Sequence, residues 1–128
     1  MRLLLDTHAL LWFLADDPKL SSAAKSAIGD PANERWLSPI SLLEIAIKVR
    51  IGKLALHAPF GGLFPAHLTL NRIQLVPLAI AHIEPLATLP LHHRDPFDRL
   101  LAATALVEGL HIVSADAVFD SYGLSRVW

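Results

Sequence analysis

The chain has no cysteine, and it has no excess of charge of either sign. The missing cysteines exclude disulfide bonds, thiolate catalysis and cysteine-ligated zinc. With 11 Lys and Arg against 12 Asp and Glu, the formal net charge is −1, so no overall basic field marks a nucleic-acid binder. No glycine-rich phosphate loop and no GxSxG nucleophile motif occurs. An anionic substrate would therefore need a local basic patch or a metal ion.

A long hydrophobic run is also missing. Residues 1–5 begin like a signal peptide, but Asp6 and His8 interrupt them, and the apolar run 9–15 is too short to span a bilayer. An Asp-Asp-Pro turn follows it in place of a small-residue cleavage site. We therefore expect no signal peptide, no membrane contact and a cytoplasmic location, which the absence of cysteine fits.

What the chain does have is apolar side chains. Hydrophobic residues make up 53% of the 128 positions, and the mean hydropathy is +0.45. This length supports a genuine core and predicts a single domain over residues 1–128. The high apolar content indicates either that a sheet is covered on both faces or that some apolar surface is buried against a partner.

Strand and helix signals alternate along the chain without repeats or linkers. The expected strands are 3–5, 36–37, 73–76, 112–113 and 124–127. The expected helices are 8–14, 21–28, 38–51, 79–86 and 95–108, and segment 59–70 is ambiguous because two glycines weaken it. The alternation predicts an α/β fold with a mostly parallel sheet, in which ligands bind beyond the carboxyl ends of the strands.

Four isolated acids mark the edges of the predicted core: Asp6, Glu44, Asp98 and Asp116. Asp6 and Asp116 follow predicted strands, whereas Glu44 and Asp98 fall in early turns of predicted helices. An unpaired buried carboxylate is costly, and carboxylate oxygens suit Mg²⁺ or Mn²⁺. One or two such ions can activate a water for phosphodiester hydrolysis.

Three of these acids also have ordinary structural explanations. Asp6 and Asp116 are good helix N-caps. Asp95 and Asp98 resemble an acidic capping box around Pro96, although Asp95 could also be an outer-shell group or a substitute ligand.

Glu44 is harder to explain in this way. It interrupts an otherwise apolar helical stripe made by Ile40, Ile47 and Ile51. A pair with Lys48 would contribute only about 0.2–0.5 kcal/mol, too little to offset burial of a carboxylate. This imbalance favours a functional role for Glu44.

Basic and imidazole groups lie near the third acid. His92 and His93 match no zinc spacing, so a loop-facing or capping role is favoured over metal binding. Arg94 and Arg99 flank Asp98 and are candidates for phosphate binding, and Arg99 could equally pair with an acid.

Four segments together resemble the PIN-domain ribonucleases, in particular the VapC toxins of bacterial toxin–antitoxin pairs. They are LLLDTHALLW (3–12), SLLEI (41–45), HHRDPFDRLL (92–101) and VSAD (113–116). The resemblance implies a three-layer α/β/α sandwich and Mg²⁺- or Mn²⁺-dependent RNA cleavage. By their places in these motifs, Asp6, Glu44 and Asp98 match the core metal-binding acids, and Asp116 matches a fourth, more variable one.

The same resemblance implies accessory groups and partners. Thr7 or Ser114 would help to position water or metal. The family commonly forms homodimers and is silenced by a VapB-type antitoxin, whose C-terminal segment lies in a groove at the active site. Leu43 departs from relatives that often carry Trp at this position, which bears on partner packing more than on catalysis.

Two other functions compete with an endoribonuclease. A receiver-like phosphoacceptor domain needs an acid after its third strand and a late lysine, but that strand ends at Val76-Pro77 and no lysine follows Lys53. A catalytically silent PIN-like domain that only binds RNA or a protein stays open, because intact ligands do not guarantee turnover.

Overall fold

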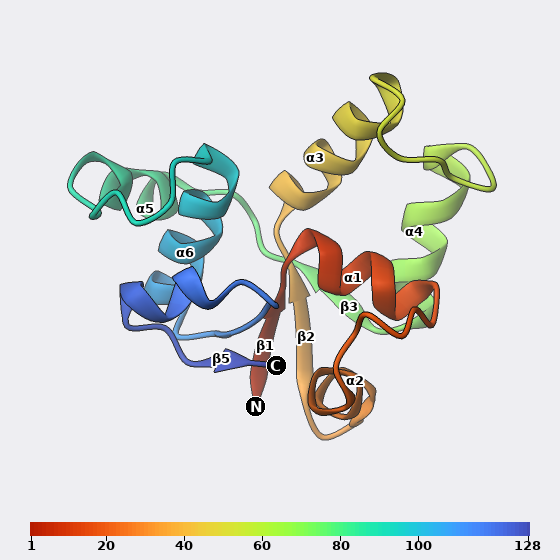
Figure 1. The fold of residues 1–128 in the computed structure, drawn as a ribbon, viewed down its shortest axis with the longest axis horizontal. Coiled ribbons are helices and arrows are strands. Elements are labelled where there is room, and N and C mark those ends of the chain that lie inside the picture. The colour runs from red at the N-terminus through yellow and green to blue at the C-terminus, as the bar shows by residue number, and fades with distance from the viewer.

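A computed structural model describes all residues from 1 to 128 and contains one five-stranded sheet (Figure 1). The strands are β1 (Arg2–Leu5), β2 (Glu34–Leu37), β3 (Ile73–Leu75), β4 (His111–Val113) and β5 (Arg126–Val127). Their order is β3-β2-β1-β4-β5, and all neighbours run parallel. The strand order therefore reverses between β1 and β4, which is the position where open α/β sheets usually bind ligands.

Four of the six α-helices begin after a residue whose side chain satisfies a free backbone N–H group of the first turn. Side chains of Asp6, Ser21, Ser38 and Asp95 accept these first hydrogen bonds. The α-helices are α1 (Thr7–Leu14), α2 (Ser22–Gly29), α3 (Pro39–Arg50), α4 (Phe60–Leu70), α5 (Ile80–Ile83) and α6 (Pro96–Glu108). Two 3₁₀ helices, η1 (Glu84–Ala87) and η2 (Ala117–Tyr122), complete the set.

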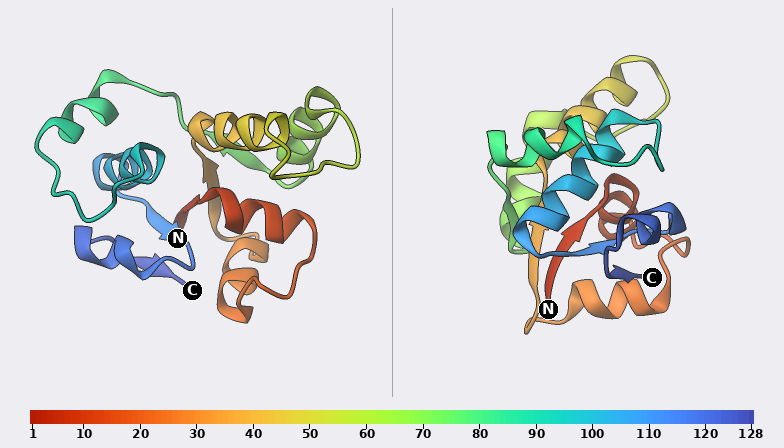
Figure 2. Two further views of the ribbon diagram at one scale, coloured as in Figure 1. Left: turned by 45° about the horizontal axis from the view of Figure 1, so that its top comes forward. Right: turned by 90° about the vertical axis from the view of Figure 1, so that its left-hand side faces the viewer.

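Two apolar clusters cover the two faces of the sheet. Leu3 and Leu5 pack on one face with side chains of α1, α2 and α4, whereas Leu4 packs on the other with α6 and η2. Figure 2 shows these two groups of helices on opposite sides of the strands. The layers confirm the predicted α/β sandwich, and burial on both faces of the sheet explains why residues 3–5 of the central strand β1 are all apolar.

Segment 59–70, left ambiguous by its sequence, forms helix α4. Leu63, Phe64 and Leu68 are buried in the first cluster. Their burial outweighs the poor helix propensity of Gly61, Gly62 and Pro65, because tertiary packing supplies most helical stability in proteins. The predicted helix 79–86 is instead a single turn, α5, followed by η1.

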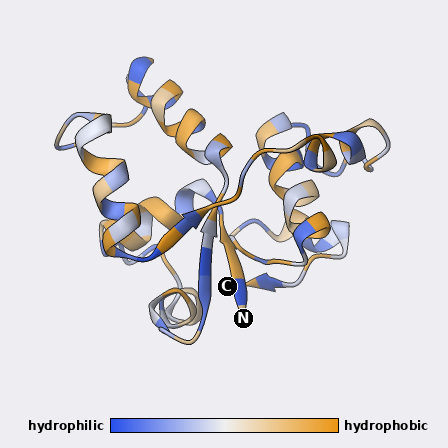
Figure 3. Ribbon diagram, turned by 180° about the vertical axis from the view of Figure 1, so that it is seen from behind, coloured by the Kyte–Doolittle hydropathy of each residue, from blue (hydrophilic) through white to orange (hydrophobic).

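The predicted core stripe of the Glu44 helix is wrong. The buried residues of α3 are Ser41 and Ile45, whereas Ile47 is 41% exposed and Ile51 is 58% exposed. Helix α3 lies at the upper left of Figure 3, and its ribbon is partly coloured hydrophobic. Some of these hydrophobic residues face solvent. None of the helices combines the length and the apolarity that crossing a membrane requires.

Candidate metal centre

Asp6 lies at the carboxyl end of β1, beside the end of β4. Parallel pairing of Leu5 with Val113 brings Asp6 next to Ser114, and the Asp6 amide donates to the Val113 carbonyl at 3.1 Å. Its Oδ1 accepts a 2.7 Å hydrogen bond from the amide of Ala9. Burial raises the pKa of Asp6, although hydrogen bonds from Ser114 and Ala9 oppose the shift. The predicted N-cap role of Asp6 is therefore confirmed.

Glu44 reaches the same region from α3. The Thr7 hydroxyl donates to Glu44 Oε1 at 2.9 Å, and Lys48 Nζ lies 2.9 Å from Oε2. The Glu44 side chain is 15% exposed, so its carboxylate is held between a hydroxyl and an ammonium group. The sequence-based alternative, a pair with Lys48, is therefore present in the structure alongside the contact to Thr7.

Asp98 enters from the first turn of α6. Its pKa rises to about 6, chiefly through burial and then through the like charge of Asp95, while His93 opposes the rise. Glu44 and Asp6 raise it further, so these carboxylates lie close enough to repel one another. Asp95 is exposed and caps α6 by accepting from the amide of Phe97 at 2.8 Å. Of this pair, the structure brings Asp98 toward the other acids.

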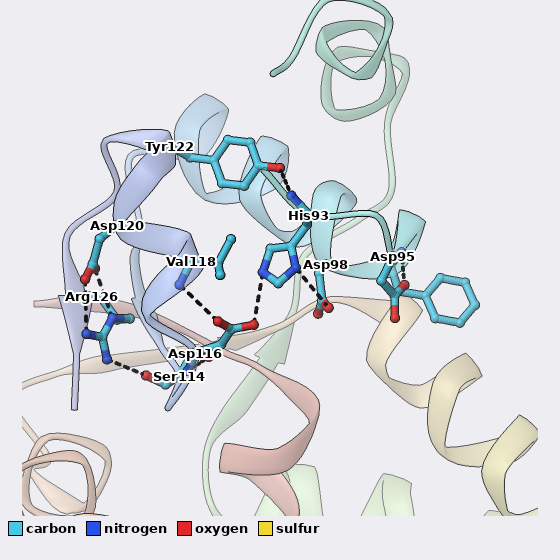
Figure 4. Close-up of polar contacts among 10 residues, drawn as sticks. His93, Asp95, Asp98, Ser114, Asp116, Val118, Asp120, Tyr122 and Arg126 are labelled. Carbon is cyan, nitrogen blue, oxygen red and sulfur yellow. Dashed lines mark hydrogen bonds and ion pairs between the residues drawn. The ribbon is translucent and has the colours of Figure 1, made fainter. Parts of the chain in front are cut away.

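Asp116 and His93 complete the arrangement (Figure 4). Asp116 accepts from the Val118 amide at 2.9 Å, which caps η2. Its Oδ2 lies 3.1 Å from His93 Nε2, and His93 Nδ1 lies 3.7 Å from Asp98 Oδ2. One ligand atom from each of these three side chains lies within 4.8 Å of the others, which is close enough to share a metal ion.

Two basic residues near Asp98 make contacts that the sequence does not specify. His93 was assigned a loop or capping role, but its ring lies between two of the acids. The only sequence signal was its place directly before the α6 cap, because its spacing fits no metal motif. Arg99 donates to the carbonyls of Leu86 and Leu89, so it ties down the segment before α6 and pairs with no acid.

Comparison with known proteins identifies the family. The model of the PIN domain matches residues 3–124. The chain belongs to the PIN-domain family. It is 30% identical over 129 residues to "Ribonuclease VapC22" of Mycobacterium tuberculosis, covering 98% of this chain and 97% of that relative.

Solved structures share the PIN fold of this chain. VapBC2 from Rickettsia felis, bound to a DNA fragment from its promoter, gives a TM-score of 0.72 at 15% identity over 100% of both chains. VapBC-1 from nontypeable Haemophilus influenzae gives 0.64 at 18% identity, covering 98% of this chain and 96% of that chain. At these identities the likeness confirms the three-layer sandwich alone.

The electrostatics of this PIN domain fit a divalent cation. Asp6, Glu44 and Asp98 lie close enough for their charges to interact, and His93 links Asp98 to Asp116. The basic groups near these acids are Lys48, His93 and His8. The pKa of Asp6 and of Asp98 is raised, so ionising both is unfavourable without a cation. In addition, the buried Nε2 of His93 makes no hydrogen bond. A bound metal would offset the repulsion between the carboxylates and would give His93 Nε2 a partner.

A groove opens beside the acids. It encloses about 560 Å³ between α1, the segment after α3, and α4, and Trp12, Leu56 and Phe64 contribute to its apolar lining. Lys48 also lines it, so the groove adjoins the Glu44 end of the acidic site. The PIN domain therefore offers an extended surface next to its candidate centre.

Proposed function

We propose that this PIN domain is a divalent-metal-dependent endoribonuclease and the toxin of a toxin–antitoxin pair. The grouping of Asp6, Glu44 and Asp98, with Asp116 joined to Asp98 through His93, carries this proposal, because it combines the expected ligand type with the expected edge of the sheet. The 30% identity to Ribonuclease VapC22 supports the activity.

In the proposed mechanism, Asp6, Asp98 and Asp116 hold Mg²⁺ or Mn²⁺, and Glu44 completes the acidic set. When bound, the ion supplies an activated water and stabilises the leaving oxygen of the phosphodiester. Ser114 orients Asp6 by hydrogen bonding, and Thr7 orients Glu44. These contacts fix the carboxylates before substrate arrives, which lowers the cost of reaching the reactive geometry.

RNA would meet a local basic surface, since the net charge of the chain is −1. Lys48, Arg50 and Lys53 cluster at the end of α3 and just after it. Two of them, Lys48 and Lys53, also line the groove. We expect single-stranded or looped RNA, because its bases are open to side chains. Cellular RNA as the substrate makes the cytoplasm the proposed site of action.

The proposed protein partner is a VapB-type antitoxin whose apolar segment fills the groove. Two of the structures with this fold are VapBC assemblies, which supports such a pairing. A helix or extended segment bearing aliphatic side chains would match the lining formed by Trp12, Leu56 and Phe64. A basic side chain at the end of that segment would reach the acids and silence them.

A second copy of this chain is the other proposed partner. Leu43 and Ile47 of α3 and Ile80 and Ile83 of α5 are each more than 40% exposed, and these aliphatic side chains are candidates for a surface that a partner covers. Sedimentation of the wild type and of Ile47→Glu and Ile80→Glu variants tests the homodimer. A monomeric wild-type protein contradicts it.

Expression in a bacterial host tests the toxin function. Induced wild-type protein should arrest growth and produce discrete RNA fragments, while Asp6→Asn should do neither at an equal level of folded protein. Coexpression of a VapB-type antitoxin should restore growth. Folded protein that binds RNA without cleaving it would instead support the silent PIN domain, an alternative favoured by the Lys48 contact that already occupies Glu44.

A further inference from the structure

His93 is held rigidly against the acidic site. Its backbone N–H donates to the Tyr122 hydroxyl at 2.8 Å. Its ring lies 4.9 Å from the Phe119 ring and stacks at 13° on the Tyr122 ring, 6.3 Å away. The side chain is only 11% exposed. The imidazole is therefore positioned before any ligand binds.

Both ring nitrogens lie near carboxylate oxygens, as Figure 4 shows. Nε2 lies 3.1 Å from Asp116 Oδ2, yet this buried atom makes no hydrogen bond. The distance is short enough for one, so the ring plane must direct Nε2 away from that oxygen. If His93 positioned Asp116 through a hydrogen bond, Nε2 would have to point toward Asp116 Oδ2. Nε2 is thus a buried polar atom without a partner beside two metal-ligand candidates.

The spacing instead suits shared coordination. Two adjacent ligands of an octahedral ion, each about 2.1 Å from the metal, lie about 3 Å apart. The 3.1 Å separation of Nε2 and Asp116 Oδ2 fits this value. Imidazole nitrogen is a good ligand for transition metals, whereas Mg²⁺ prefers oxygen. An imidazole in an otherwise carboxylate site therefore changes which ions bind well.

We propose that His93 is a nitrogen ligand of the metal centre, together with Asp98 and Asp116, and that it makes the centre select Mn²⁺ over Mg²⁺. The inference rests on the proposed metal dependence of the nuclease, and it adds a ligand that the four-acid set lacks. His92, the neighbouring imidazole, is exposed and packs edge-on against Tyr122 at 4.9 Å. It provides a matched control one residue away.

Pulsed electron paramagnetic resonance of the Mn²⁺-loaded protein tests this ligand directly. The wild type should show a nitrogen coupling to Mn²⁺ that changes when its histidines carry ¹⁵N. His93→Gln should lose the coupling, and His92→Gln should keep it.

Loss of even an outer-shell partner typically weakens metal binding by about 10–100-fold, so titration calorimetry of His93→Gln should show Mn²⁺ affinity reduced at least about tenfold. Mg²⁺ affinity should change little.

Three results would overturn the proposal: no Mn²⁺ binding, bound Mn²⁺ without nitrogen coupling in the wild type, or a coupling that persists in His93→Gln. The wild-type spectrum alone shows whether a nitrogen atom is bound to Mn²⁺, so the proposal can be overturned even if His93→Gln fails to fold. Neither measurement uses RNA. A nitrogen coupling in a protein that cleaves nothing would sink the nuclease proposal alone, whereas metal-dependent cleavage without the coupling would sink the His93 ligand alone.

Discussion

Thr7 and Glu44 join the first turn of α1 to α3 through one 2.9 Å hydrogen bond, from the Thr7 hydroxyl to Glu44 Oε1. Thr7 is 3% exposed, so its hydroxyl has little access to water as an alternative partner. The bond fixes the carboxylate that approaches the metal centre from the α3 side. The hydrogen bond from Thr7 therefore orients the Glu44 carboxylate before any metal binds.

Replacing Thr7 by Val should therefore misplace Glu44 while leaving the packing nearly unchanged. We expect RNA cleavage to fall roughly tenfold through loss of positioning, and stability to fall by about 1 kcal/mol. Thr7→Ser keeps the hydroxyl and should retain most of the activity. Initial cleavage rates and urea unfolding of both variants check this. Equal activity in Thr7→Val and the wild type would remove Thr7 from the mechanism.

Lys48 would compete with a metal ion bound at the proposed site, because its ammonium group lies 2.9 Å from Glu44 Oε2. Lys48→Met keeps the apolar stem but removes the charge, so the site becomes more negative. We expect metal affinity to rise roughly 3–10-fold, the effect of one nearby charge in a partly solvated site. Lys53→Met is the control, since Lys53 lines the same groove without an ion pair. Weaker metal binding in Lys48→Met would contradict the prediction.

The two roles of Asp6 are separable by substitution. Asp6→Asn preserves an N-cap acceptor for the amide of Ala9 but removes the charge, so it should abolish metal-dependent cleavage with little loss of stability. Asp6→Ala removes both, and should cost roughly 1 kcal/mol more in unfolding free energy. Thermal or urea unfolding alongside the cleavage assay distinguishes them. An active Asp6→Asn protein would exclude Asp6 from the centre.

Asp98 makes the stability of the metal-free protein depend on pH. Its pKa is about 6 in the folded chain against 3.8 as the reference value. The folded state therefore binds this proton more tightly, and the resulting stabilisation is fully present below about pH 3.8 and is lost as pH rises through about 6. Between pH 4 and 7.5 the wild type should lose roughly 1–2 kcal/mol relative to Asp98→Asn, allowing for solvent screening.

Urea unfolding in EDTA at several pH values measures this difference. Asp95→Asn keeps a capping side chain but removes the neighbouring charge that raises the Asp98 pKa, so its pH dependence should be intermediate. Saturating metal should reverse the trend, because it requires the ionised carboxylate. Parallel pH profiles for the wild type and Asp98→Asn would show that Asp98 does not titrate in this way.

The layout of the fold could be predicted because local signals agree with it. Apolar runs, Ser and Asp caps and the Pro96 helix start all indicated alternating strands and helices, and Asp6 and Asp116 followed from the strand ends. Helix α4 could not be assigned with the same assurance, since its glycines and Pro65 oppose the helix and only burial of Leu63 and Phe64 explains it.

The site was predicted less completely. The sequence singles out Glu44 because it breaks a supposed core stripe, yet Ile47 and Ile51 on that stripe are exposed, and what holds Glu44 in the structure is a hydrogen bond from Thr7. A metal-binding role for Glu44 stays a prediction. His93 was passed over because its position depends on Tyr122, which lies 29 residues further along. No local spacing encodes such a contact, so the motifs point to the four acids but not to the imidazole that lies beside Asp98 and Asp116.

The most direct test of metal-dependent RNA cleavage is digestion of total cellular RNA by the purified protein with Mn²⁺, with Mg²⁺ and with EDTA. Asp6→Asn, purified identically, runs in parallel. The account predicts discrete fragments that need metal, disappear in EDTA and are absent with Asp6→Asn. Equal fragments from both proteins, or none from a wild type that binds the metal, would contradict it.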